Sequence, residues 1–487
     1  MLDLAVVGAG VGGCYCAYRL VTDTGPGDGI ALFEQTDRIG GRLWSEPVRD
    51  APHLIAELGA MRLHRGLRSA LALVRHLGLD LAPFEFGRPE NLVHRRGVAM
   101  RCRELPGDRI VEAAERLVPG FAELRRRHHE AEERGDRRRS ESLLDVFRDQ
   151  RDQTRVSGRP LDELTWPHAL DFALGPAAVA FLHDTGGYDL RRSGENAATQ
   201  LDLVFRTPPD AEYVTLRHGM QGLPDALHAR FTAAGGTTRT GHRLVRLDKE
   251  ADHYRLTFTT PGGDRHTLAR AVVLALPPEA LRRLDGLPLA RHLRPALDAV
   301  EPVPAFKLFL VYPRPWWREL GITRGRSTTD TALRQLWYGG TCPATESTGP
   351  ALLLAAYPSG HSVHAWAPWR GGPPHPAAEA GHAATAAMVE HAHTLLARMH
   401  DLPDLERPLS ACRQDWTAAW HVWRPGHDPR VIGPRTRQPI PGEAIHVVGD
   451  CWTPDPGSIE GTLASADDLL RVSFELPDPQ WHTGPPR

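Results

Sequence analysis

One glycine-rich turn near the N-terminus restricts the fold more than any other feature of this sequence. Residues 4–7 are apolar and have the composition of a buried strand, and Gly8, Gly10 and Gly13 follow in the pattern GxGxxG. The first glycine permits a tight turn, the second lets the backbone approach a pyrophosphate, and the third allows a helix to pack closely. Residues 14–22 have the pattern of that helix, whose N-terminus attracts anions. The order of strand, glycines and helix predicts a dinucleotide-binding site.

A carboxylate after the second predicted strand indicates which nucleotide is bound. Residues 30–33 are apolar, and Glu34 comes directly after them. A carboxylate at this point can accept hydrogen bonds from both ribose hydroxyls, and it disfavours a 2′-phosphate. No second GxGxxG follows a strand elsewhere in the sequence. This favours a bound flavin that the substrate itself reduces over a separate NAD(P)H site.

The composition excludes several classes of protein. The chain has 487 residues, enough for about three domains of roughly 150 residues each. Its 58 basic and 60 acidic residues nearly cancel, so no overall field attracts nucleic acid or an anionic membrane. No apolar run approaches the ~18 residues of a membrane span. Because the first predicted strand starts at residue 2, we expect no signal peptide and a cytoplasmic location.

The residues that commonly bind metals form no recognised pattern. The six cysteines include no CxxC pair and no zinc spacing, so we expect reduced, buried thiols. The 25 histidines are scattered along the chain. His391 and His393 fall on different sides of a predicted helix, since only residues three or four apart share a face. The sequence therefore predicts no metal site.

Lysine is almost absent, which draws attention to one of its two positions. Of the 58 basic residues, 56 are arginines and only Lys249 and Lys307 are lysines. Lys249 lies between two acidic residues and reads as a surface residue. Lys307 lies in an apolar segment typical of a strand. A buried ammonium is costly without partners, and its pKa shifts easily where that of arginine does not. Lys307 is therefore a candidate functional residue.

Motifs spread along the chain resemble those of the flavin amine oxidase superfamily, and specifically its L-amino acid oxidase branch. The first group comprises GAGVGG (residues 8–13), FEQTDRIGGRL (33–43) and ELGAMR (57–62). The middle group comprises GMQGLP (219–224), AVVLALP (271–277), FKLF (306–309), Trp316-Trp317 and GRSTTD (325–330). The last group comprises HVVGD (446–450) and GSIEG (457–461). Their order along the chain is far more specific than any single motif.

The resemblance implies an α/β fold in which a Rossmann-like FAD-binding domain is interleaved with a mixed-sheet substrate-binding domain and a helical subdomain. The FAD-binding domain would consist of residues 1–50, 215–300 and 435–475. The substrate-binding domain would consist of residues 51–104, 186–214 and 301–434. The helical subdomain would span residues 105–185, and residues 476–487 would form a loose tail.

Local patterns add detail to this organisation. Apolar spacing predicts helices over residues 110–124, 143–147 and 377–399. Residues 125–139 contain many arginines and acids with opposite charges four residues apart. We interpret this stretch as a solvated helix face or a mobile loop, with a docking patch as the alternative.

The resemblance also implies that FAD is the cofactor. Neither tryptophan position of the family's aromatic cage offers an attachment cysteine, so non-covalent binding is expected. Glu460 and Gly461 would begin the last helix, with backbone amides facing the pyrimidine end of the flavin. The residues implied around the cofactor are Gly8, Gly10, Gly13, Glu34, Gly41, Arg42, Gly59, Ala60, Met61, Val245, Gly449, Asp450, Ser458, Ile459 and Glu460.

Three residues are implied to act on the substrate or on oxygen. In L-amino acid oxidases the position of Arg62 binds the substrate carboxylate, to which a planar guanidinium is well suited. Tyr357 would share that carboxylate; the alternative is a tyrosine simply buried at a strand end. Lys307 would hold a water near flavin N5 and assist the oxygen chemistry; the alternative is a lysine reaching solvent from a strand edge.

Trp420 corresponds to one wall of the family's aromatic cage. In the alternative interpretation, Trp416, Trp420 and Trp423 are spaced as the core stripe of one helix. Family members commonly have Trp or Tyr just before the apolar residue of the closing motif, but this chain has Ser458. That change removes a second wall and leaves room for a bulky side chain. The weaker candidates for substrate contacts are Tyr338, His421, Trp423 and Ser458.

The resemblance predicts oxidation of the α-amine of an L-amino acid, with O2 reduced to H2O2 and release of keto acid and ammonia. The alternatives are a decarboxylating amino acid 2-monooxygenase, which gives the amide, and a polyamine or monoamine oxidase. Arg62 favours an amino acid over a simple amine, while abundant tryptophan and Ser458 favour an aromatic or bulky side chain. A homodimer is one expectation for such an enzyme, and the Arg-, Pro- and Ala-rich composition is typical of a GC-rich bacterium.

Overall fold

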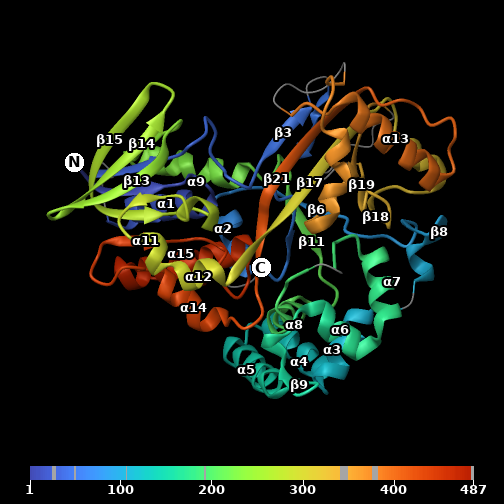
Figure 1. Cartoon of the computed structure of the whole chain (residues 1–487), viewed down its shortest axis with the longest axis horizontal. Coiled ribbons are helices and arrows are strands. Elements are labelled where there is room, and N and C mark those ends of the chain that lie inside the picture. The colour runs from blue at the N-terminus through green and yellow to red at the C-terminus, as the bar shows by residue number, and fades with distance from the viewer. Residues whose placement is uncertain are drawn as a thin grey trace.

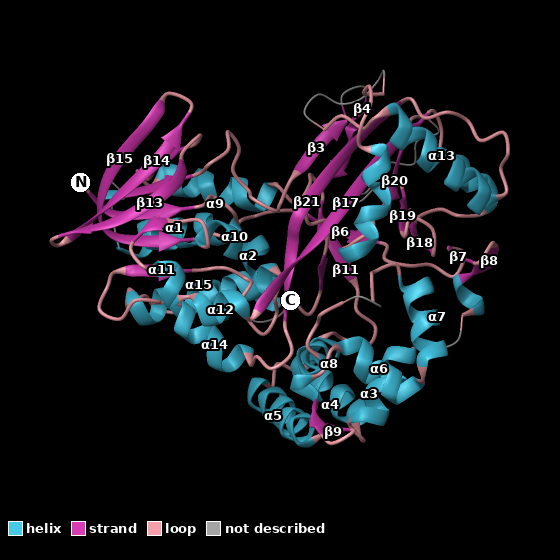
Figure 2. Ribbon diagram, viewed as in Figure 1, coloured by secondary structure: helices cyan, strands magenta, loops and turns pink. Residues whose placement is uncertain are grey.

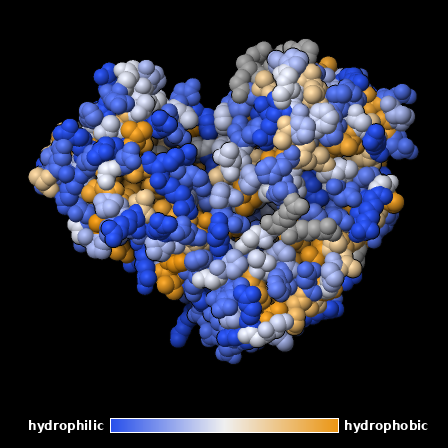
Figure 3. All heavy atoms as spheres, in the orientation of Figure 1, coloured by the Kyte–Doolittle hydropathy of each residue, from blue (hydrophilic) through white to orange (hydrophobic). Residues whose placement is uncertain are grey.

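The computed structural model describes residues 1–24, 29–48, 51–105, 107–190, 193–339, 349–375 and 382–483. Figures 1 and 2 show three groups of elements: a sheet with helices near the N-terminus, a second large sheet, and a cluster of helices below both. The architecture is mixed α/β, as predicted. The face drawn in Figure 3 is mostly hydrophilic, with apolar residues scattered over it.

The first sheet contains the glycine-rich turn. Its strands follow the order β12-β2-β1-β15-β14-β13-β16, with β22 paired to β15. The central strand β1 (Leu2–Val7) pairs in parallel with β2 (Ile30–Phe33) and β15 (Gly263–Leu274). The remaining strands are β12 (Thr237–Arg239), β13 (Arg243–Glu250), β14 (His253–Thr260), β16 (Asp285–Gly286) and β22 (Ile445–Val447). Three separate parts of the chain therefore build one sheet.

Three helices pack on one face of this sheet around the glycine-rich turn. They are α1 (Val11–Thr24), α9 (Gly222–Ala233) and α15 (Ile459–Ser473), and α1 contacts both of the others. Gly8 has a φ of +100°, and a Cβ there would collide with the carbonyl of Ala275. A Cβ on Gly13 would collide with the carbonyl of Gly8. Glycine is thus required for the turn and for the close approach of α1, as the motif predicts.

The second sheet is mixed and has the strand order β21-β17-β20-β19-β18-β7-β8. Its strands are β21 (Ser410–Trp423), β17 (Val300–Tyr312), β20 (Ala351–Ala356), β19 (Gln335–Tyr338), β18 (Gly325–Thr329), β7 (Leu92–Arg95) and β8 (Val98–Arg101). All neighbours are antiparallel except β18 and β7. Smaller sheets beside it are β5 (Leu63–His64)-β11 (Tyr213–Leu216)-β6 (Leu81–Phe84) and β3 (Ser45–Val48)-β4 (Ala51–Glu57).

The long strand β17 separates two apolar cores. Phe306, Leu308 and Leu310 pack into a core that includes α13 (Ala386–His400). Phe309 and Val311 pack on the other face, in a core that includes residues of β4. Because side chains alternate along a strand, Lys307 shares this second face. Lys307 is therefore held inside the protein beside the ELGAMR segment.

The helical group consists of α3 (Arg109–Leu117), α4 (Phe121–Glu133), α5 (Arg137–Gln153), α6 (Trp166–Leu174), α7 (Pro176–Gly186) and α8 (Ala197–Arg206). Its core contains Phe121, Phe147 and Phe205, and the rings of Phe147 and Phe205 stack with centroids 4.1 Å apart. Because α8 supplies Phe205, the helical group extends beyond residue 185, where the sequence-based boundary lay. The helix predicted over residues 143–147 lies within α5.

The remaining elements are short. The helices are α2 (Arg68–His76), α10 (Pro278–Leu281), α11 (Leu289–His292), α12 (Arg294–Asp298) and α14 (Pro429–Thr436). A hairpin joins β9 (Arg155–Val156) and β10 (Arg159–Pro160). The 3₁₀ segments are Cys102–Glu104, Leu161–Glu163, Trp316–Leu320, Gly360–Trp369 and Gln480–Thr483.

Two helices differ from their predicted extents. The helix predicted over residues 110–124 is interrupted, because α3 ends at Leu117 and Gly120 adopts a left-handed conformation (φ +87°) before α4. The second helix, predicted over residues 377–399, begins at Ala386 as α13. Its expected first residues fall partly on 376–381, outside the described part of the chain.

The arginine-rich stretch is largely an exposed helix face, as one of the two interpretations has it, and part of the C-terminal tail is ordered. Residues 125–139 lie on α4 and α5, and Arg125 is buried, donating to the backbone carbonyl of Thr207 at 2.7 Å. In the tail, Trp481 stacks on the ring of His76 with centroids 4.2 Å apart. Arg19 also donates to the carbonyl of Pro477 at 2.6 Å. The prediction of a loose tail is therefore wrong up to Trp481, since apolar stacking fixes it to α1 and α2.

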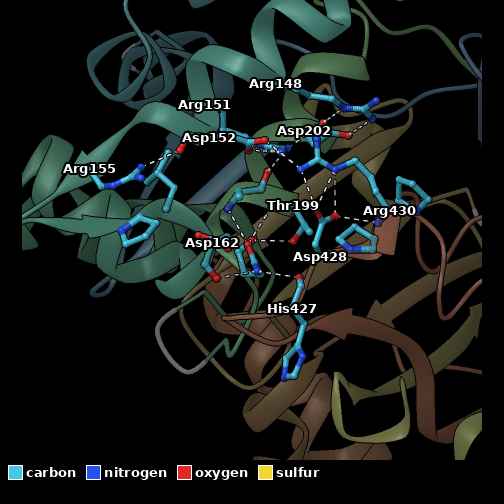
Figure 4. Close-up of a pocket in the computed structure, with 16 residues that line it drawn as sticks. Arg148, Arg151, Asp152, Arg155, Asp162, Thr199, Asp202, His427, Asp428 and Arg430 are labelled. Carbon is cyan, nitrogen blue, oxygen red and sulfur yellow. Dashed lines mark hydrogen bonds and ion pairs between the residues drawn. The ribbon is translucent and has the colours of Figure 1, made fainter. Parts of the chain in front are cut away.

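A cavity of about 340 Å³ lies where α5, α8 and the start of α14 meet (Figure 4). Its charged side chains pair with one another. Asp202 accepts hydrogen bonds from Arg148 at 2.8 Å and from Arg151 at 3.1 Å, while Arg430 reaches Asp152 at 3.0 Å. Burial alone would raise the pKa of Asp202, but its arginine partners bring it down to about 2. The pairs of Asp202 join α8 to α5 within the helical group, and the pair of Arg430 with Asp152 joins α5 to α14.

We expect Asp202→Asn to lower the free energy of unfolding by about 3–5 kcal/mol, because it leaves buried arginines without their carboxylate. Urea unfolding at neutral pH measures the loss. Asp149→Asn, at an exposed position on α5, is the matched control and should change stability by less than about 0.5 kcal/mol. Equal effects of the two substitutions would show that the ion pairs do not hold this junction.

The same carboxylate predicts a dependence of stability on pH. Its pKa in the folded protein, about 2, lies below the roughly 3.9 of an unfolded aspartate. Ionised Asp202 therefore contributes stability above about pH 4, and this contribution is lost as the pH falls toward 2. Over that range the wild-type protein should lose more stability than Asp202→Asn does.

Candidate active site

An ion pair links the FEQTDRIGGRL motif to the HVVGD motif. The guanidinium of Arg42 is paired with the buried carboxylate of Asp450, with one contact at 3.2 Å. Asp450 also accepts from the backbone N–H of Gly457 at 2.9 Å, and Arg42 donates to the carbonyl of Ala419 at 3.2 Å. Burial would raise the pKa of Asp450, but the charge of Arg42 keeps it below its usual value. Asp450 is therefore ionised. It contacts Arg42 and Gly457 directly, and Arg42 extends the connection to Ala419.

Glu34 lies at the edge of the glycine-rich turn, where the sequence places it. Its carboxylate accepts hydrogen bonds from the backbone N–H of Ala9 and from Thr36, all at 3.0 Å. An ionised carboxylate has about four acceptor positions, so these contacts leave capacity for ribose hydroxyls. The glycine turn, the N-terminus of α1 and Glu34 thus form a cradle that fits a dinucleotide such as FAD.

Of the other residues predicted near the cofactor, Gly41 lies against this cradle. Gly41 has a φ of +58° and lies against Gly10, so a side chain on Gly41 would crowd the turn. Val245 is the extra residue at a bulge in β13, between the paired residues Leu244 and Arg246. The backbone N–H of Gly449 reaches the hydroxyl of Ser465 at 3.2 Å.

At the start of α15, three residues predicted to lie near the cofactor make contacts within the protein. Ser458 caps the helix: its hydroxyl accepts from the N–H of Gly461 at 2.8 Å and donates to the carbonyl of Asp455 at 2.9 Å. Ile459 follows it in the core beside α1. The carboxylate of Glu460 accepts from the backbone N–H groups of Ser69 and Ala70 at the start of α2. The carboxylate of Glu460 is therefore already engaged, and only the backbone of this residue is available to contact a cofactor.

The ELGAMR segment lies directly on the GGRL segment. The N–H of Gly59 donates to the carbonyl of Trp44 at 3.0 Å, and that of Ala60 to the carbonyl of Arg42 at 2.9 Å. A Cβ on Gly59 would collide with the carbonyl of Arg42. Glycine at position 59 thus allows close contact between the two motifs, and it fixes where Met61 and Arg62 begin.

Lys307 is buried, with 2% of its surface exposed, and it is anchored to the ELGAMR segment. Its Nζ donates to the carbonyls of Glu57 at 2.7 Å and Gly59 at 2.6 Å, and it lies 5.0 Å from the centre of the Tyr357 ring. Burial lowers the pKa of Lys307 to about 7, with Glu57 opposing and Arg62 adding to this shift. The third contact of Nζ is to the sulfur of Met61 at 3.8 Å. A thioether is a weak acceptor, so this direction can be given up to a water. The position excludes a lysine that reaches solvent.

Arg62 lies in a box of aromatic rings. Its guanidinium carbon is 4.8–5.7 Å from the ring centres of four residues: Phe84, Phe86, Tyr213 and Trp337. Its Nη2 donates to the hydroxyl of Tyr188 at 3.1 Å. Within the described part of the chain, no carboxylate pairs with Arg62. The box holds a guanidinium in a fixed place without neutralising it.

A second guanidinium, from Arg326 in the GRSTTD motif, shares this box. It lies 4.5 Å from the ring centre of Phe86 and 5.9 Å from that of Trp337. Burial lowers the pKa of Arg326, and the charge of Arg62 adds to that effect. As for Arg62, the described residues supply no carboxylate partner. The GRSTTD motif is part of the family resemblance, but Arg326 is not among the residues predicted from it.

Tyr188 is a further residue that sequence reasoning missed. It follows α7, and its ring centre lies 6.2 Å from those of both Tyr357 and Trp420. Burial would raise the pKa of Tyr188, but the charges of Arg62 and Arg326 bring it below its usual value. The pair of glycines at 186–187 is the one sequence signal for the turn that delivers it. Arg62, Tyr357, Lys307, Trp420 and Tyr188 thus form one cluster.

The tryptophans of β21 do not form a helical stripe, because residues 410–423 are a strand. Trp420 packs over Gly457 and faces Tyr188. Trp416 donates its indole N–H to the carbonyl of Leu58 at 2.7 Å. The pairing of β21 with β17 is irregular between these two residues.

Three of the weaker candidates lie away from this cluster. Tyr338 is on the opposite face of β19 from Trp337, where its hydroxyl contacts His400 at 2.7 Å. Trp423 donates to the carbonyl of Thr453 at 2.9 Å inside the core of the first sheet. His421 contacts Glu279 at 2.9 Å and Cys451 at 3.3 Å. All three are almost fully buried, so their positions do not support substrate contacts.

Comparisons with known proteins identify the family of this chain. The sequence model of the family described as "Flavin containing amine oxidoreductase" matches residues 11–468. Aplysianin-A of Aplysia kurodai is 27% identical over 97% of this chain and 90% of its own length. An L-amino-acid oxidase of Mus musculus is 28% identical over 73% of this chain and 53% of its own length. The flavin-dependent L-tryptophan oxidase RebO of Lentzea aerocolonigenes is 27% identical over 73% of this chain and 75% of its own length.

Solved structures share the fold. Cyclohexylamine oxidase from Brevibacterium oxydans IH-35A superposes with a TM-score of 0.67 at 19% identity, covering 97% of this chain and 99% of its own. A redesigned putrescine oxidase gives a TM-score of 0.65 at 18% identity, covering 96% of this chain and 99% of its own. Among the described residues, no helix is both long and apolar enough to cross a membrane. The chain belongs to the flavin containing amine oxidoreductase family, with FAD as its cofactor.

Proposed function

We propose that this protein is an L-amino acid oxidase. An L-amino acid and O2 would give the imino acid and H2O2, and water would then convert the imino acid to keto acid and ammonia. The observation that carries the proposal is Arg62, whose guanidinium is held in an aromatic box without a carboxylate among the described residues. The names of several relatives, L-amino-acid oxidases and an L-tryptophan oxidase, point the same way.

In this proposal the residues of the cluster position the substrate. Arg62 binds the α-carboxylate through its planar fork, and the hydroxyls of Tyr188 and Tyr357 orient it. Trp420 packs beside the substrate. The glycine turn and Glu34 would hold FAD non-covalently, and the bound flavin would supply the hydride-accepting chemistry. Lys307 provides a proton or holds a water beside the reacting atoms.

Two other reactions are compatible with the fold. A decarboxylating monooxygenase would use the same carboxylate site but release the amide. An oxidase of simple amines, such as those named in the similar structures, would have no use for the guanidinium of Arg62. We propose an aromatic or bulky side chain, because Ser458 replaces a cage wall. Arg326 favours an acidic side chain as a second candidate, since its guanidinium lacks a carboxylate partner among the described residues.

Anaerobic mixing of the FAD-loaded protein with single substrates tests the function. The panel contains aromatic, large apolar and acidic L-amino acids, their D-isomers, and the corresponding amines. We expect one class of L-amino acids to bleach the flavin absorbance, while the amines do not. Reduction by the amines alone would contradict the proposal. After air is admitted, the mass of the product distinguishes the keto acid of an oxidase from the amide of a monooxygenase.

We expect Arg62→Met to weaken binding of the amino acid by about 2–5 kcal/mol, which is roughly 30-fold to several thousand-fold in Kd. The reason is loss of the charge-assisted hydrogen bonds to the carboxylate. Anaerobic titration of the flavin spectrum measures Kd, and the FAD content of the variant shows whether the fold is intact. Arg65→Met, at an exposed site three residues on, is the matched control. An unchanged Kd in Arg62→Met would refute the carboxylate role.

We expect Lys307→Met to slow reoxidation of the reduced flavin by O2, while the Kd of the amino acid stays within a few-fold of wild type. The pKa of Lys307 is about 7, so below pH 7 it carries the charge that stabilises electrons moving to oxygen. Wild-type reoxidation should therefore slow as the pH rises through 7, and this transition should be absent from the variant. Stopped-flow mixing across pH 6–9 measures both rates; a transition that persists in Lys307→Met would assign it to another group.

A further inference from the structure

Two adjacent histidines and a glutamate on α4 form a cluster far along the chain from the residues of the candidate active site. His128 and His129 are 4% and 6% exposed, and Glu132 lies one turn later. One potential ligand atom from each side chain lies within 4.8 Å of the others. His128 is four residues from Glu132 and His129 is three, so both rings reach the same carboxylate although they are neighbours in sequence.

Backbone carbonyls fix the proton on one nitrogen of each ring. His128 Nδ1 lies 2.9 Å from the carbonyl oxygen of Ser140, at the start of α5. His129 Nε2 lies 2.9 Å from the carbonyl oxygen of Phe205, in α8. A carbonyl oxygen only accepts hydrogen bonds, so each of these nitrogens must be the N–H. The other nitrogen of each neutral ring therefore carries a lone pair.

Both lone pairs are directed to the same carboxylate. His128 Nε2 is 3.8 Å from one oxygen of Glu132, and His129 Nδ1 is 3.4 Å from the other. Three electron-pair donors that face one another at a mostly buried site repel unless a positive charge lies between them. Arg68 of α2 is 3.9 Å from the carboxylate and balances part of its charge. Within the described part of the chain, its guanidinium makes no hydrogen bond to either ring nitrogen.

We propose that His128, His129 and Glu132 bind a divalent transition-metal ion of the zinc type. Metal–nitrogen and metal–oxygen bonds of about 2.0–2.2 Å in a tetrahedral arrangement place the two ligand atoms about 3.4 Å apart. The observed distances are 3.4 Å from His129 Nδ1 to one carboxylate oxygen and 3.8 Å from His128 Nε2 to the other, both close to this value. All three ligand atoms lie within 4.8 Å of one another. Imidazole and carboxylate ligands suit zinc, cobalt and nickel.

The surroundings are those of a metal-binding histidine pair. Metal-bound histidines generally donate their second N–H to a carbonyl or carboxylate, which orients the ring, and both rings do so here. Three protein ligands leave one coordination position for water. The ion would connect α4 through its ligands to Ser140 of α5 and Phe205 of α8. Its role would be to stabilise the helical group, independently of the reaction proposed above.

Metal binding to the FAD-loaded protein tests the proposal. After dialysis against a chelator, calorimetric titration with zinc chloride should show one site per chain, and cobalt should give the visible absorption of a four-coordinate centre. Glu132→Gln should weaken zinc binding at least 100-fold with little change in shape. Glu133→Gln, the exposed neighbour, is the matched control and should bind zinc as wild type does. Zinc should also raise the Tm of the wild-type protein by several degrees and leave that of Glu132→Gln unchanged.

Two outcomes would overturn the proposal. If wild type and Glu132→Gln take up zinc equally, the metal binds elsewhere on the surface. If neither binds zinc but Glu132→Gln lowers the Tm without metal, the positive charge in the cluster is a proton on one histidine, and the group is an internal ion pair. FAD content and flavin reduction should stay unchanged in every variant, because the cluster does not contact the residues of the candidate active site.

Discussion

A buried ion pair between Arg42 and Asp450 joins the parts of the chain on which the candidate active site is built. Asp450 follows the last strand of the first sheet, and Arg42 follows the second GG pair. The carbonyl of Arg42 receives the N–H of Ala60, so the ELGAMR segment rests on the same point. Lys307 then hydrogen-bonds to carbonyls of that segment from the second sheet. A chain of contacts thus runs from the nucleotide cradle to the substrate side.

The sequence predicts well what local patterns determine. The glycine-rich turn, the carboxylate of Glu34 and the burial of Lys307 each follow from a short motif or from one polar residue in an apolar strand. The discontinuous first sheet was expected because motifs near both ends of the chain resemble one family. Partners that are distant in sequence were not predictable in this way. Tyr188 and Arg62 lie 126 residues apart, and nothing in either local pattern indicates that they meet.

Tertiary contacts also decide between interpretations that local patterns leave open. Trp416, Trp420 and Trp423 have helical spacing, but pairing with the long strand β17 makes residues 410–423 a strand and excludes the alternative of a helical stripe. The tail is short and polar in composition, yet stacking of Trp481 on His76 and Tyr18 holds it in place. In both cases packing against distant residues outweighs local propensity.

The distribution of charge supports our proposal that the substrate is an amino acid and not a simple amine. At the nucleotide end, Asp450 and Glu34 have partners within the protein. At the other end, Arg62, Arg326 and Lys307 gather around aromatic rings and backbone oxygens, and their positive charges raise one another's energy. A substrate carboxylate relieves this repulsion at the guanidiniums. The same positive surroundings lower the pKa of the substrate ammonium, and the neutral amine that results has the lone pair that assists departure of hydride from Cα.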